Sequence, residues 1–274
     1  MIVERVKTIA SDFYTEGPAM DADGNIYCTT LTGGMILKID GNTRLSTWSR
    51  SSCPNGQIIL PNGDHLVCDS REAAILRFDC NGVFLRHEIF KTCGGEKISI
   101  PNDLVVDYDG GIYFTDSTRN DGKVGYRSVS GDEHIVVSGL DYPNGLVLSK
   151  NEKTLFVAES YRNRIISVNL ESAGIARDGH KLFAELPQHS SGKGESNLPD
   201  GMALDTEDQL WVAHYGMQAL RLFKPNGQLI HSIQIPFPLV SNVFIPTKHR
   251  GTVVVTGGYA EPGPGAICIL TLKH

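Results

Sequence analysis

The chain has 274 residues, of which 41 % are hydrophobic and 20 % are charged, and its formal net charge is −6. This is an ordinary globular composition, and a mildly acidic chain without a basic block gives no reason to expect nucleic acid or an anionic membrane surface as a partner. No apolar run is long enough for a transmembrane helix, and the charged segment Met1–Lys7 lacks the apolar core of a signal peptide. We therefore expect a soluble, cytoplasmic protein.

Short apolar runs bounded by Gly, Asn and Asp follow one another along the whole chain. They are rich in Val, Ile, Leu, Tyr and Phe, which favours β-strands. No stretch of about twelve or more residues combines helical periodicity with helix caps. The clearest predicted strands are Ile26–Leu31, Met35–Asp40, His65–Ser70, Ala74–Asp79, Ile112–Ser117, Thr154–Ser160, Arg164–Leu170, Leu210–Tyr215, Ala219–Lys224 and Thr252–Gly258.

The strands group into six units, at residues 12–52, 53–95, 98–140, 141–190, 196–236 and 238–274. Sets of four short strands that repeat at this period predict a β-propeller. The last unit shows only three strands, whereas the first ten residues read as a spare strand. We therefore predict an all-β, six-bladed β-propeller that forms one domain over residues 1–274. In it, a strand at residues 2–10 completes the last blade and leaves no long exposed edge.

One pattern recurs in every unit: an acidic or amide residue, a short apolar run, a turn and a second apolar run. At residues 101–116 it reads Pro-Asn-Asp-Leu-Val-Val-Asp-Tyr-Asp-Gly-Gly-Ile-Tyr-Phe-Thr-Asp. The first position carries a side-chain oxygen in all six units, where it holds Glu16, Asn55, Asn102, Asn144, Asp200 and Asn242. Turn chemistry is an alternative explanation, because Asn-Gly and Asp-Gly pairs mark turns. That explanation fits Glu16 poorly, since Glu is not a favoured turn residue.

In a propeller the first strand of each unit lines the central axis, so these six oxygens should converge at one mouth of the channel. Carboxylate and amide oxygens suit a hard divalent cation such as Ca²⁺ or Mg²⁺. Only Glu16 and Asp200 are charged, which matches one divalent ion. No His occupies this position and no Cys-x-x-Cys pair occurs, so zinc is not the first choice. The six cysteines are expected to be reduced and structural.

At these residues the sequence resembles the SMP-30/gluconolactonase/LRE-like family. Its members are calcium-dependent six-bladed propellers that include sugar lactonases and the drug-responsive lactonase, with diisopropyl-fluorophosphatase as a relative. The resemblance covers nearly the whole chain. The matching stretches are Glu16-Gly-Pro18, Pro101-Asn-Asp103 with Ile112-Tyr-Phe-Thr-Asp116, Tyr142-Pro-Asn-Gly-Leu146, and Pro199-Asp-Gly-Met202 with Leu210-Trp-Val-Ala-His214.

The resemblance implies a Ca²⁺ cofactor, with Mg²⁺ or Zn²⁺ as alternatives, held by Glu16, Asn144 and Asp200. It makes Asp200 the catalytic candidate and places Asn102 beside the metal as a ligand or substrate contact. The implied reaction is the opening of a small-molecule lactone, as in gluconolactonases. The chain departs from the animal sugar lactonases at Ile100, where those proteins have an Arg that helps to hold the sugar. The departure bears on the sugar substrate and not on lactone hydrolysis itself.

Lactone hydrolysis needs an activated water and a stabilised oxyanion, which a bound cation and an adjacent carboxylate can provide. Asp200 could act as a general base or as a nucleophile, and the sequence does not separate the two. No Gly-x-Ser-x-Gly elbow occurs, which argues against a serine hydrolase. Two other functions stay open: a phosphotriesterase-like hydrolase at the same metal site, and a non-enzymatic propeller that binds a ligand.

Several further polar residues are candidates for the pocket. Asn55, His214, Tyr161 and Arg119 are predicted substrate contacts, each with a structural role as the alternative. Asp69, Asp116 and Glu159 end second strands at a repeated position and would line the pocket or hold turns, and Arg71 follows the first of them. Two long connections, Lys91–Ser99 and Gln188–Asn197, lead directly to channel candidates and are predicted to form a rim or lid.

Overall fold

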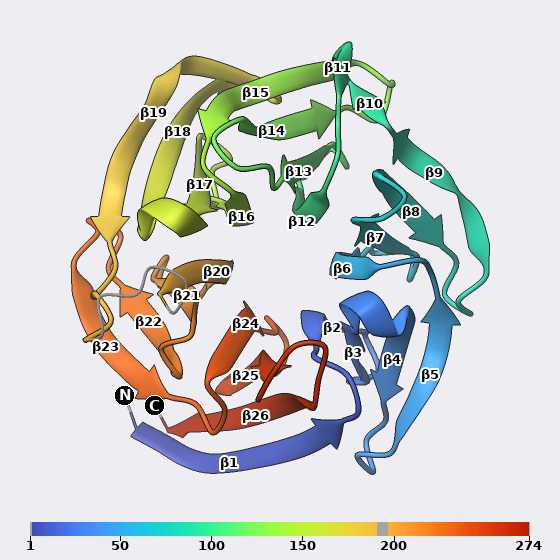
Figure 1. The fold of residues 1–274 in the computed structure, drawn as a ribbon, viewed down its shortest axis with the longest axis vertical. Helices are drawn as coiled ribbons and strands as arrows, with labels where there is room; N and C mark the ends of the chain where they lie inside the picture. The colour runs from blue at the N-terminus through green and yellow to red at the C-terminus, as the bar shows by residue number, and fades with distance from the viewer. Residues whose placement is uncertain (1, 191–196, 274) are drawn as a thin grey trace.

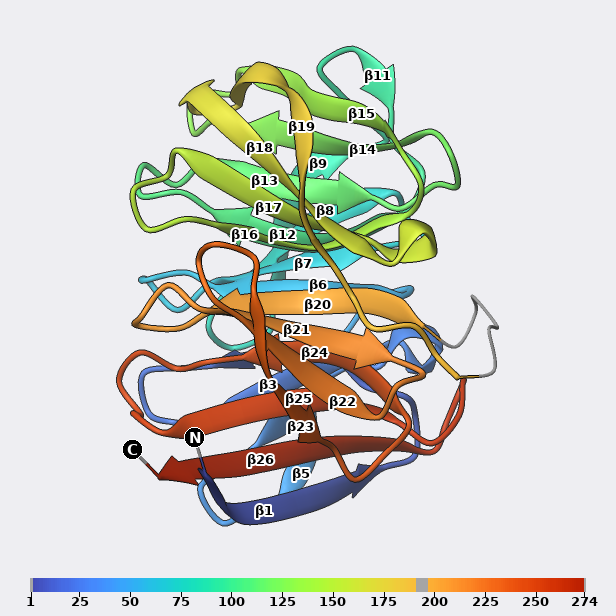
Figure 2. The same cartoon turned by 90° about the vertical axis from the view of Figure 1, so that its left-hand side faces the viewer.

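A computed structural model describes residues 2–190 and 197–273. Six antiparallel sheets stand around a central axis like the blades of a propeller (Figure 1). Figure 2 shows the same ring from its edge, with the blades twisted along their length. The predicted six-bladed propeller is therefore confirmed, and each predicted unit corresponds to one blade.

Each blade is built outward from the axis, with its first strand innermost. Blade 1 contains β2 (Glu16–Met20), β3 (Ile26–Thr29), β4 (Met35–Ile39) and β5 (Leu45–Arg50). Blade 2 contains β6 (Pro54–Ile59), β7 (His65–Asp69), β8 (Ala74–Phe78) and β9 (Phe84–Phe90), extended by β10 (Thr92–Cys93) and β11 (Glu96–Lys97). Blade 3 contains β12 (Pro101–Val106), β13 (Ile112–Asp116), β14 (Gly122–Arg127) and β15 (Glu133–Leu140).

Blades 4 to 6 repeat the arrangement. Blade 4 contains β16 (Pro143–Leu148), β17 (Thr154–Glu159), β18 (Arg164–Ser172) and β19 (Ile175–Glu185). Blade 5 contains β20 (Leu198–Leu204), β21 (Leu210–Tyr215), β22 (Ala219–Phe223) and β23 (Leu229–Gln234). Blade 6 contains β24 (Leu239–Phe244), β25 (Thr252–Gly258), β26 (Gly265–Lys273) and, as its outer strand, β1 (Ile2–Ser11). Two short 3₁₀ helices, η1 (Leu31–Gly33) and η2 (Ser160–Arg162), follow second strands.

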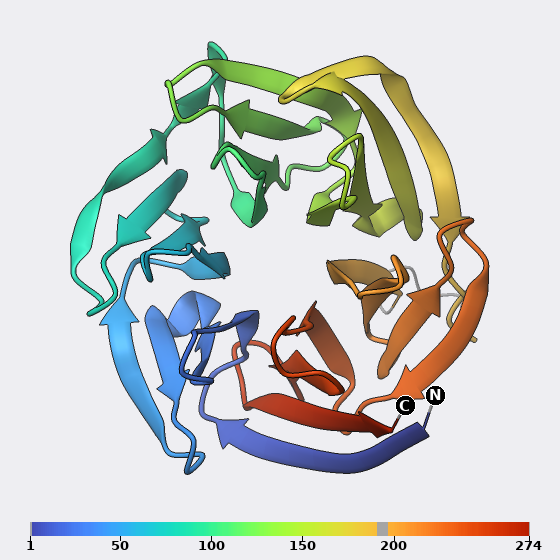
Figure 3. The ribbon, with the colours of Figure 1, turned by 180° about the vertical axis from the view of Figure 1, so that it is seen from behind.

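The N-terminal strand closes the ring as predicted. β1 runs antiparallel to β26, from Ile2 opposite Lys273 to Ser11 opposite Gly265. The two ends of the chain consequently lie side by side at blade 6 (Figure 3). Pairing the first strand with the last joins residues that are far apart in sequence and removes an open sheet edge.

The core lies between the blades rather than at the axis. Among the described residues, six clusters of buried apolar side chains each join one pair of neighbouring blades. Trp211 of blade 5, for example, packs in one cluster with Val240 and Val255 of blade 6. Successive side chains of a strand point to opposite faces of the blade, so alternate residues of the inner and middle strands pack against the two neighbouring blades. The first residues of the inner strands, at one end of the axis, are thereby left to polar groups.

The Asn-Gly and Asp-Gly pairs at the axis lie inside inner strands, so the turn explanation for them is wrong. The glycine is required because neighbouring inner strands approach closely: a Cβ on Gly145 would lie 2.4 Å from the carbonyl oxygen of Asp200. The pairing register shifts at this point in every blade, for example between Pro143 and Leu146. Such bulges bend the strand and re-aim side chains, which turns the channel residues toward the axis.

The first long connection does not form a rim over the channel. Residues 92–97 instead form the β10–β11 hairpin, which packs on the outer strands of blade 3. Cys93 is buried there with its Sγ 3.4 Å from the carbonyl oxygen of Tyr126, and Lys123 pairs with Glu96 at 2.6 Å. Residues 191–196 of the second connection lie outside the described residues.

All six cysteines lie in the described part of the chain and all are free thiols, as predicted. Four are buried, Cys53 is half-buried and Cys80 is exposed, so the structural role predicted for every cysteine does not hold for Cys80. Neither of the two three-residue helices, nor any other helix in the described ranges, could cross a lipid bilayer.

Candidate functional site

A polar cavity of about 430 Å³ opens where the inner strands begin. Five of the six predicted channel residues line it, namely Glu16, Asn55, Asn102, Asn144 and Asp200. It opens on the face turned to the viewer in Figure 1, where η1 and η2 lie. The remaining lining residues are Tyr14, Leu31, Tyr142, Ser160, Tyr161, Leu198, Tyr215 and Glu261.

Serine hydroxyls hold the start of three inner strands in place. Each follows the second strand of one blade and donates a hydrogen bond to the carbonyl just before the channel residue of the next blade. Ser160, for example, donates to the carbonyl of Pro199 at 2.7 Å, directly before Asp200. Ser117 binds Pro143 in the same way at 2.5 Å. The third hydroxyl, that of the half-buried Ser70, donates to the carbonyl of Pro101 at 3.0 Å, and the three bonds together help to fix the channel residues.

Of the three carboxylates that line the cavity, Glu16 and Asp200 are buried and share a strongly acidic environment, whereas Glu261 is exposed. Glu16 is 6 % exposed and Asp200 is 7 % exposed. Burial raises the pKa of both groups well above the usual range of a carboxyl, and repulsion from neighbouring acids such as Asp103 raises both further. Among the described residues, no Lys, Arg or His lines the cavity. This part of the site therefore has an unbalanced negative charge that protons or a bound cation must offset.

A second acidic layer lies deeper along the axis. Asp103 is buried beside Asn242, whose Nδ2 lies 3.4 Å from the Asp103 Oδ2, and burial raises the pKa of Asp103 to about 6. Both residues line a different cavity, of about 260 Å³, whose other walls come from the later, mainly apolar halves of the inner strands. The structure thus corrects one prediction: Asn242 does not line the mouth with the other five. Its side chain is engaged with Asp103 and with its neighbour's backbone, since Val243 N donates to Asn242 Oδ1 at 2.8 Å.

The oxygen groups of the mouth fit a divalent cation. Two carboxylates and several amides converge there from different blades, which is a donor set of the kind that Ca²⁺ selects. The Oδ1 atom of Asn55 is buried and has no hydrogen-bond partner among the described residues, so an unused acceptor faces this region. No group of three or more His, Cys, Asp and Glu side chains in the described ranges could hold a metal by itself. A cation would therefore depend on the amide oxygens as well as on Glu16 and Asp200.

Two of the predicted substrate contacts lie at the rim. Tyr161 belongs to η2, lines the cavity and is 40 % exposed. Its ring stacks under the guanidinium of Arg119, with 3.5 Å between the guanidinium carbon and the ring centroid. Arg119 does not line the cavity, and its Nε lies 2.6 Å from Asp141 Oδ1. Its role is therefore to support the ring of Tyr161.

His214 does not reach the cavity, and its predicted contact with substrate does not hold. The side chain has no exposed surface, and Arg221 Nε donates to His214 Nδ1 at 3.1 Å. The ring proton is therefore on Nε2, which lies 3.3 Å from Asn163 Oδ1. Burial, together with the nearby Arg221 charge, lowers the pKa of His214 to about 3. His214 is a neutral structural residue.

The acids at the ends of the second strands also have structural roles. Asp69, Asp116 and Glu159 are buried, and none of them lines the cavity. Each accepts hydrogen bonds from the backbone just before an inner strand; Asp116 Oδ1, for example, accepts from Ile100 N at 2.6 Å. Arg71 is exposed and outside the lining. These acids hold the loops that lead to the channel residues.

Sequence reasoning missed a group of tyrosines and one acid at the mouth. Tyr14, Tyr142 and Tyr215 line the cavity, and the Tyr215 hydroxyl donates to Glu261 at 2.8 Å. A signal for two of them was present, because Tyr14 and Tyr142 stand two positions before a channel residue. Both lie just before their inner strands, so the repeat position rather than the strand period would have marked them. Glu261 lies in the β25–β26 connection, where no repeat could mark it.

Comparison with known proteins agrees with this architecture. Residues 14–258 match the model of the SMP-30/Gluconolactonase/LRE-like region. The chain belongs to this family. It is 32 % identical to the lactonase drp35 of Staphylococcus haemolyticus over 235 residues, which cover 81 % of this chain and 69 % of that one. It is 27 % identical to the gluconolactonase of Zymomonas mobilis over 256 residues, which cover 82 % and 71 %.

Solved structures show the same fold. A gluconolactonase from Xanthomonas campestris superposes with a TM-score of 0.83 and 23 % identity over 99 % of this chain and 91 % of its own. A calcium-binding protein, regucalcin, from Agrobacterium tumefaciens superposes with a TM-score of 0.75 and 14 % identity, covering 95 % and 90 %. At these identities the likeness concerns the fold.

Proposed function

We propose that this protein is a lactone hydrolase that works with a divalent cation, Ca²⁺ in the first instance, bound by Glu16, Asn144 and Asp200. The observation that carries the proposal is the meeting of these three side chains in one cavity of a chain that belongs to a lactonase family. Relatives named lactonase and gluconolactonase support the reaction, and the calcium-binding neighbour supports the choice of ion.

The bound cation would polarise the lactone carbonyl and offset the negative charge that develops on its oxygen. The protein groups supply the remaining steps. Asp200 accepts the proton of the attacking water, whose oxygen adds to the carbonyl carbon. The bond between this carbon and the ring oxygen then breaks, the ring oxygen takes up a proton, and the product is a hydroxy acid. Attack by the Asp200 carboxylate itself is the second route, with water opening the resulting ester.

The other lining residues orient the substrate in this proposal. Asn102 and Asn55 present amide groups from two of the three blades that supply no ligand. Tyr161, backed by Arg119, covers the rim from η2. Four tyrosine rings around an acidic floor narrow the opening and limit the water that reaches the reacting carbon.

The test is acid release from a panel of sugar, aliphatic and aromatic lactones, with calcium and with a chelator. Asp200→Asn, assayed at saturating calcium, should lose about 10²–10⁴-fold in rate, because it keeps the shape and removes the base. Asp208→Asn is the matched control, since this exposed residue of the same blade pairs only with Lys150, at 3.0 Å, on the surface. Equal activities for the two variants would contradict the role of Asp200. A wild type that opens no lactone would instead favour a ligand-binding propeller.

A further inference from the structure

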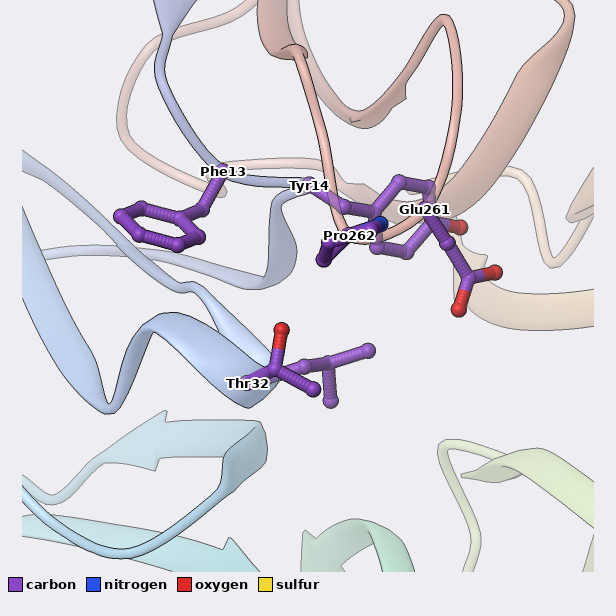
Figure 4. A pocket seen from close by; sticks show the side chains of 6 residues that line it. Phe13, Tyr14, Thr32, Glu261 and Pro262 are labelled. Carbon is purple, nitrogen blue, oxygen red and sulfur yellow. The ribbon is translucent and has the colours of Figure 1, made fainter.

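A second cavity of about 430 Å³ adjoins the carboxylate cavity at the interface of blades 1 and 6. Its walls come from the connection between β1 and β2, from η1 and from the β25–β26 connection. Figure 4 shows Phe13 and Pro262 above the space, Thr32 below it and the carboxylate of Glu261 at one end. Neither the family match nor the channel pattern of the sequence accounts for this cavity.

The walls of this cavity are largely carbon. Phe13, Leu31 and Pro262 supply apolar surface, and Thr32 adds a methyl group and a hydroxyl. Within the part of the chain that the structure describes, Glu261 is the one charged side chain of the lining, and its carboxylate accepts a hydrogen bond from the Tyr215 hydroxyl. Gly33 packs closely against Phe13, since a Cβ on Gly33 would lie 2.7 Å from the Phe13 ring. A pocket with few polar groups favours an apolar ligand group.

The two cavities are neighbours that share part of their walls. Tyr14, Leu31 and Glu261 line both of them. The Tyr14 side chain is 2 % exposed, and its hydroxyl has no hydrogen-bond partner among the described residues. A buried hydroxyl without a partner is unfavourable, so a bound molecule that accepts its proton would bind better. The hydroxyl therefore marks the junction as a place for a substrate oxygen.

Leu31 is held in an unusual backbone conformation at this junction, with φ of 44°. This left-handed region is unfavourable for a residue with a branched apolar side chain, and the strain is typical of functional sites. Asn would suit the backbone better, yet the chain has an apolar side chain here. The position therefore favours a contact that needs carbon surface.

We propose that this cavity is an apolar subsite for the alkyl or aryl substituent of a lactone whose ring lies in the carboxylate cavity. The proposal rests on the lactonase function proposed above. Tyr14 donates a hydrogen bond to a ring or carbonyl oxygen at the junction, and Phe13, Leu31 and Pro262 contact the substituent. The substrate class is then a lactone with an apolar side chain, rather than a sugar lactone with hydroxyls at every carbon.

The test uses the full-length, calcium-loaded protein and a series of γ-lactones, from γ-butyrolactone to γ-lactones with alkyl chains of increasing length. Each methylene that enters the subsite should raise kcat/KM by about 4-fold, the equivalent of about 0.8 kcal/mol per buried CH₂. Leu31→Asn, which suits the left-handed backbone, should flatten this dependence on chain length. Leu229→Asn, at an exposed position of the outer strand β23, is the control and should keep it.

A second measurement separates the subsite from the reaction. Calorimetric titration with γ-alkyl lactams, which resist hydrolysis, should show tighter binding with each added methylene in the wild type and no gain in Leu31→Asn. A wild type that opens γ-butyrolactone with no gain along the series would overturn the subsite alone. A protein that opens no lactone would overturn the proposed reaction, and the titration would then decide on the subsite. Lactam binding that is independent of chain length would refute it.

Discussion

Gly145 offers a direct test of how closely the inner strands of blades 4 and 5 must approach. An Ala at this position would place its Cβ 2.4 Å from the carbonyl oxygen of Asp200 and 2.6 Å from the Cα of Gly201. Both neighbours are backbone atoms, so no side chain can rotate away. The backbone of Gly145 has no positive φ, and the substitution therefore probes the close approach rather than the conformational freedom of Gly.

The size of the effect follows from these distances. An ordinary contact of a Cβ begins at 3.4 Å, so β20 must move by about 1 Å relative to β16. Overpacking of this kind costs typically about 1–3 kcal/mol, which corresponds to a fall in Tm of about 2–10 °C for a chain of this size. The displaced residue is Asp200. A displacement of about 1 Å in an active site can lower the rate about 10²-fold, so Gly145→Ala should lose lactonase activity while it still folds.

The assay compares kcat/KM and Tm of Gly145→Ala with those of Gly41→Ala. Gly41 lies in the turn between β4 and β5, and a Cβ there would meet nothing within 4 Å. The control should keep the Tm within about 2 °C and the activity of the wild type. Wild-type activity and Tm in Gly145→Ala would refute the argument that glycine is needed for close approach. A loss of Tm with full activity would refute only the positioning of Asp200.

Three further results are expected. Ser160→Ala should lower the free energy of unfolding in urea by about 1–3 kcal/mol, because it leaves the buried carbonyl of Pro199 without its donor, whereas Ser46→Ala at the surface should change little. Deletion of residues 1–10 should lower Tm and cause aggregation visible by light scattering, since β26 becomes an exposed edge; an unchanged monomer would contradict this closure. Burial lowers the pKa of His65 to about 4, so the unfolded chain binds one more proton between pH 6.5 and 4 and stability falls as the pH falls through this range. His65→Gln should reduce that slope by about 1.4 kcal/mol per pH unit in urea titrations, and an unchanged slope would show that another group is responsible.

The fold could be predicted almost completely because its signals are local. Strand runs such as Leu210–Tyr215 and Thr252–Gly258 have the bounds that the sequence predicts. Apolar alternation and turn residues mark each strand, and the repeat then counts the blades. The closure of the ring could be predicted by counting strands, since the last unit showed only three and the N-terminal residues formed one additional strand. None of these inferences needed to place a side chain in space.

The site was harder to predict because bulges decouple side-chain direction from strand period. Asn102 and Asp103 are adjacent, so a regular strand would point them to opposite faces. The register shift between Pro101 and Leu104 lets both reach the axis, Asn102 at the mouth and Asp103 one layer deeper. His214 shows the opposite case. It lies at the end of a strand as predicted, but its ring bonds to Arg221 and Asn163 in the core and does not reach the cavity.

The sequence repeat could have predicted some of the residues that shape the opening. Two positions before the channel residue stand Tyr14 in blade 1, Tyr142 in blade 4 and Leu198 in blade 5, and all three line the cavity. These are the blades that supply Glu16, Asn144 and Asp200, the proposed cation ligands. In blades 2 and 3 the same position holds Cys53 and Ile100, neither of which lines the cavity. Each proposed ligand is thus preceded, two positions earlier, by a large side chain that lines the cavity, so the blades that carry the proposed ligands also build part of the wall of the opening.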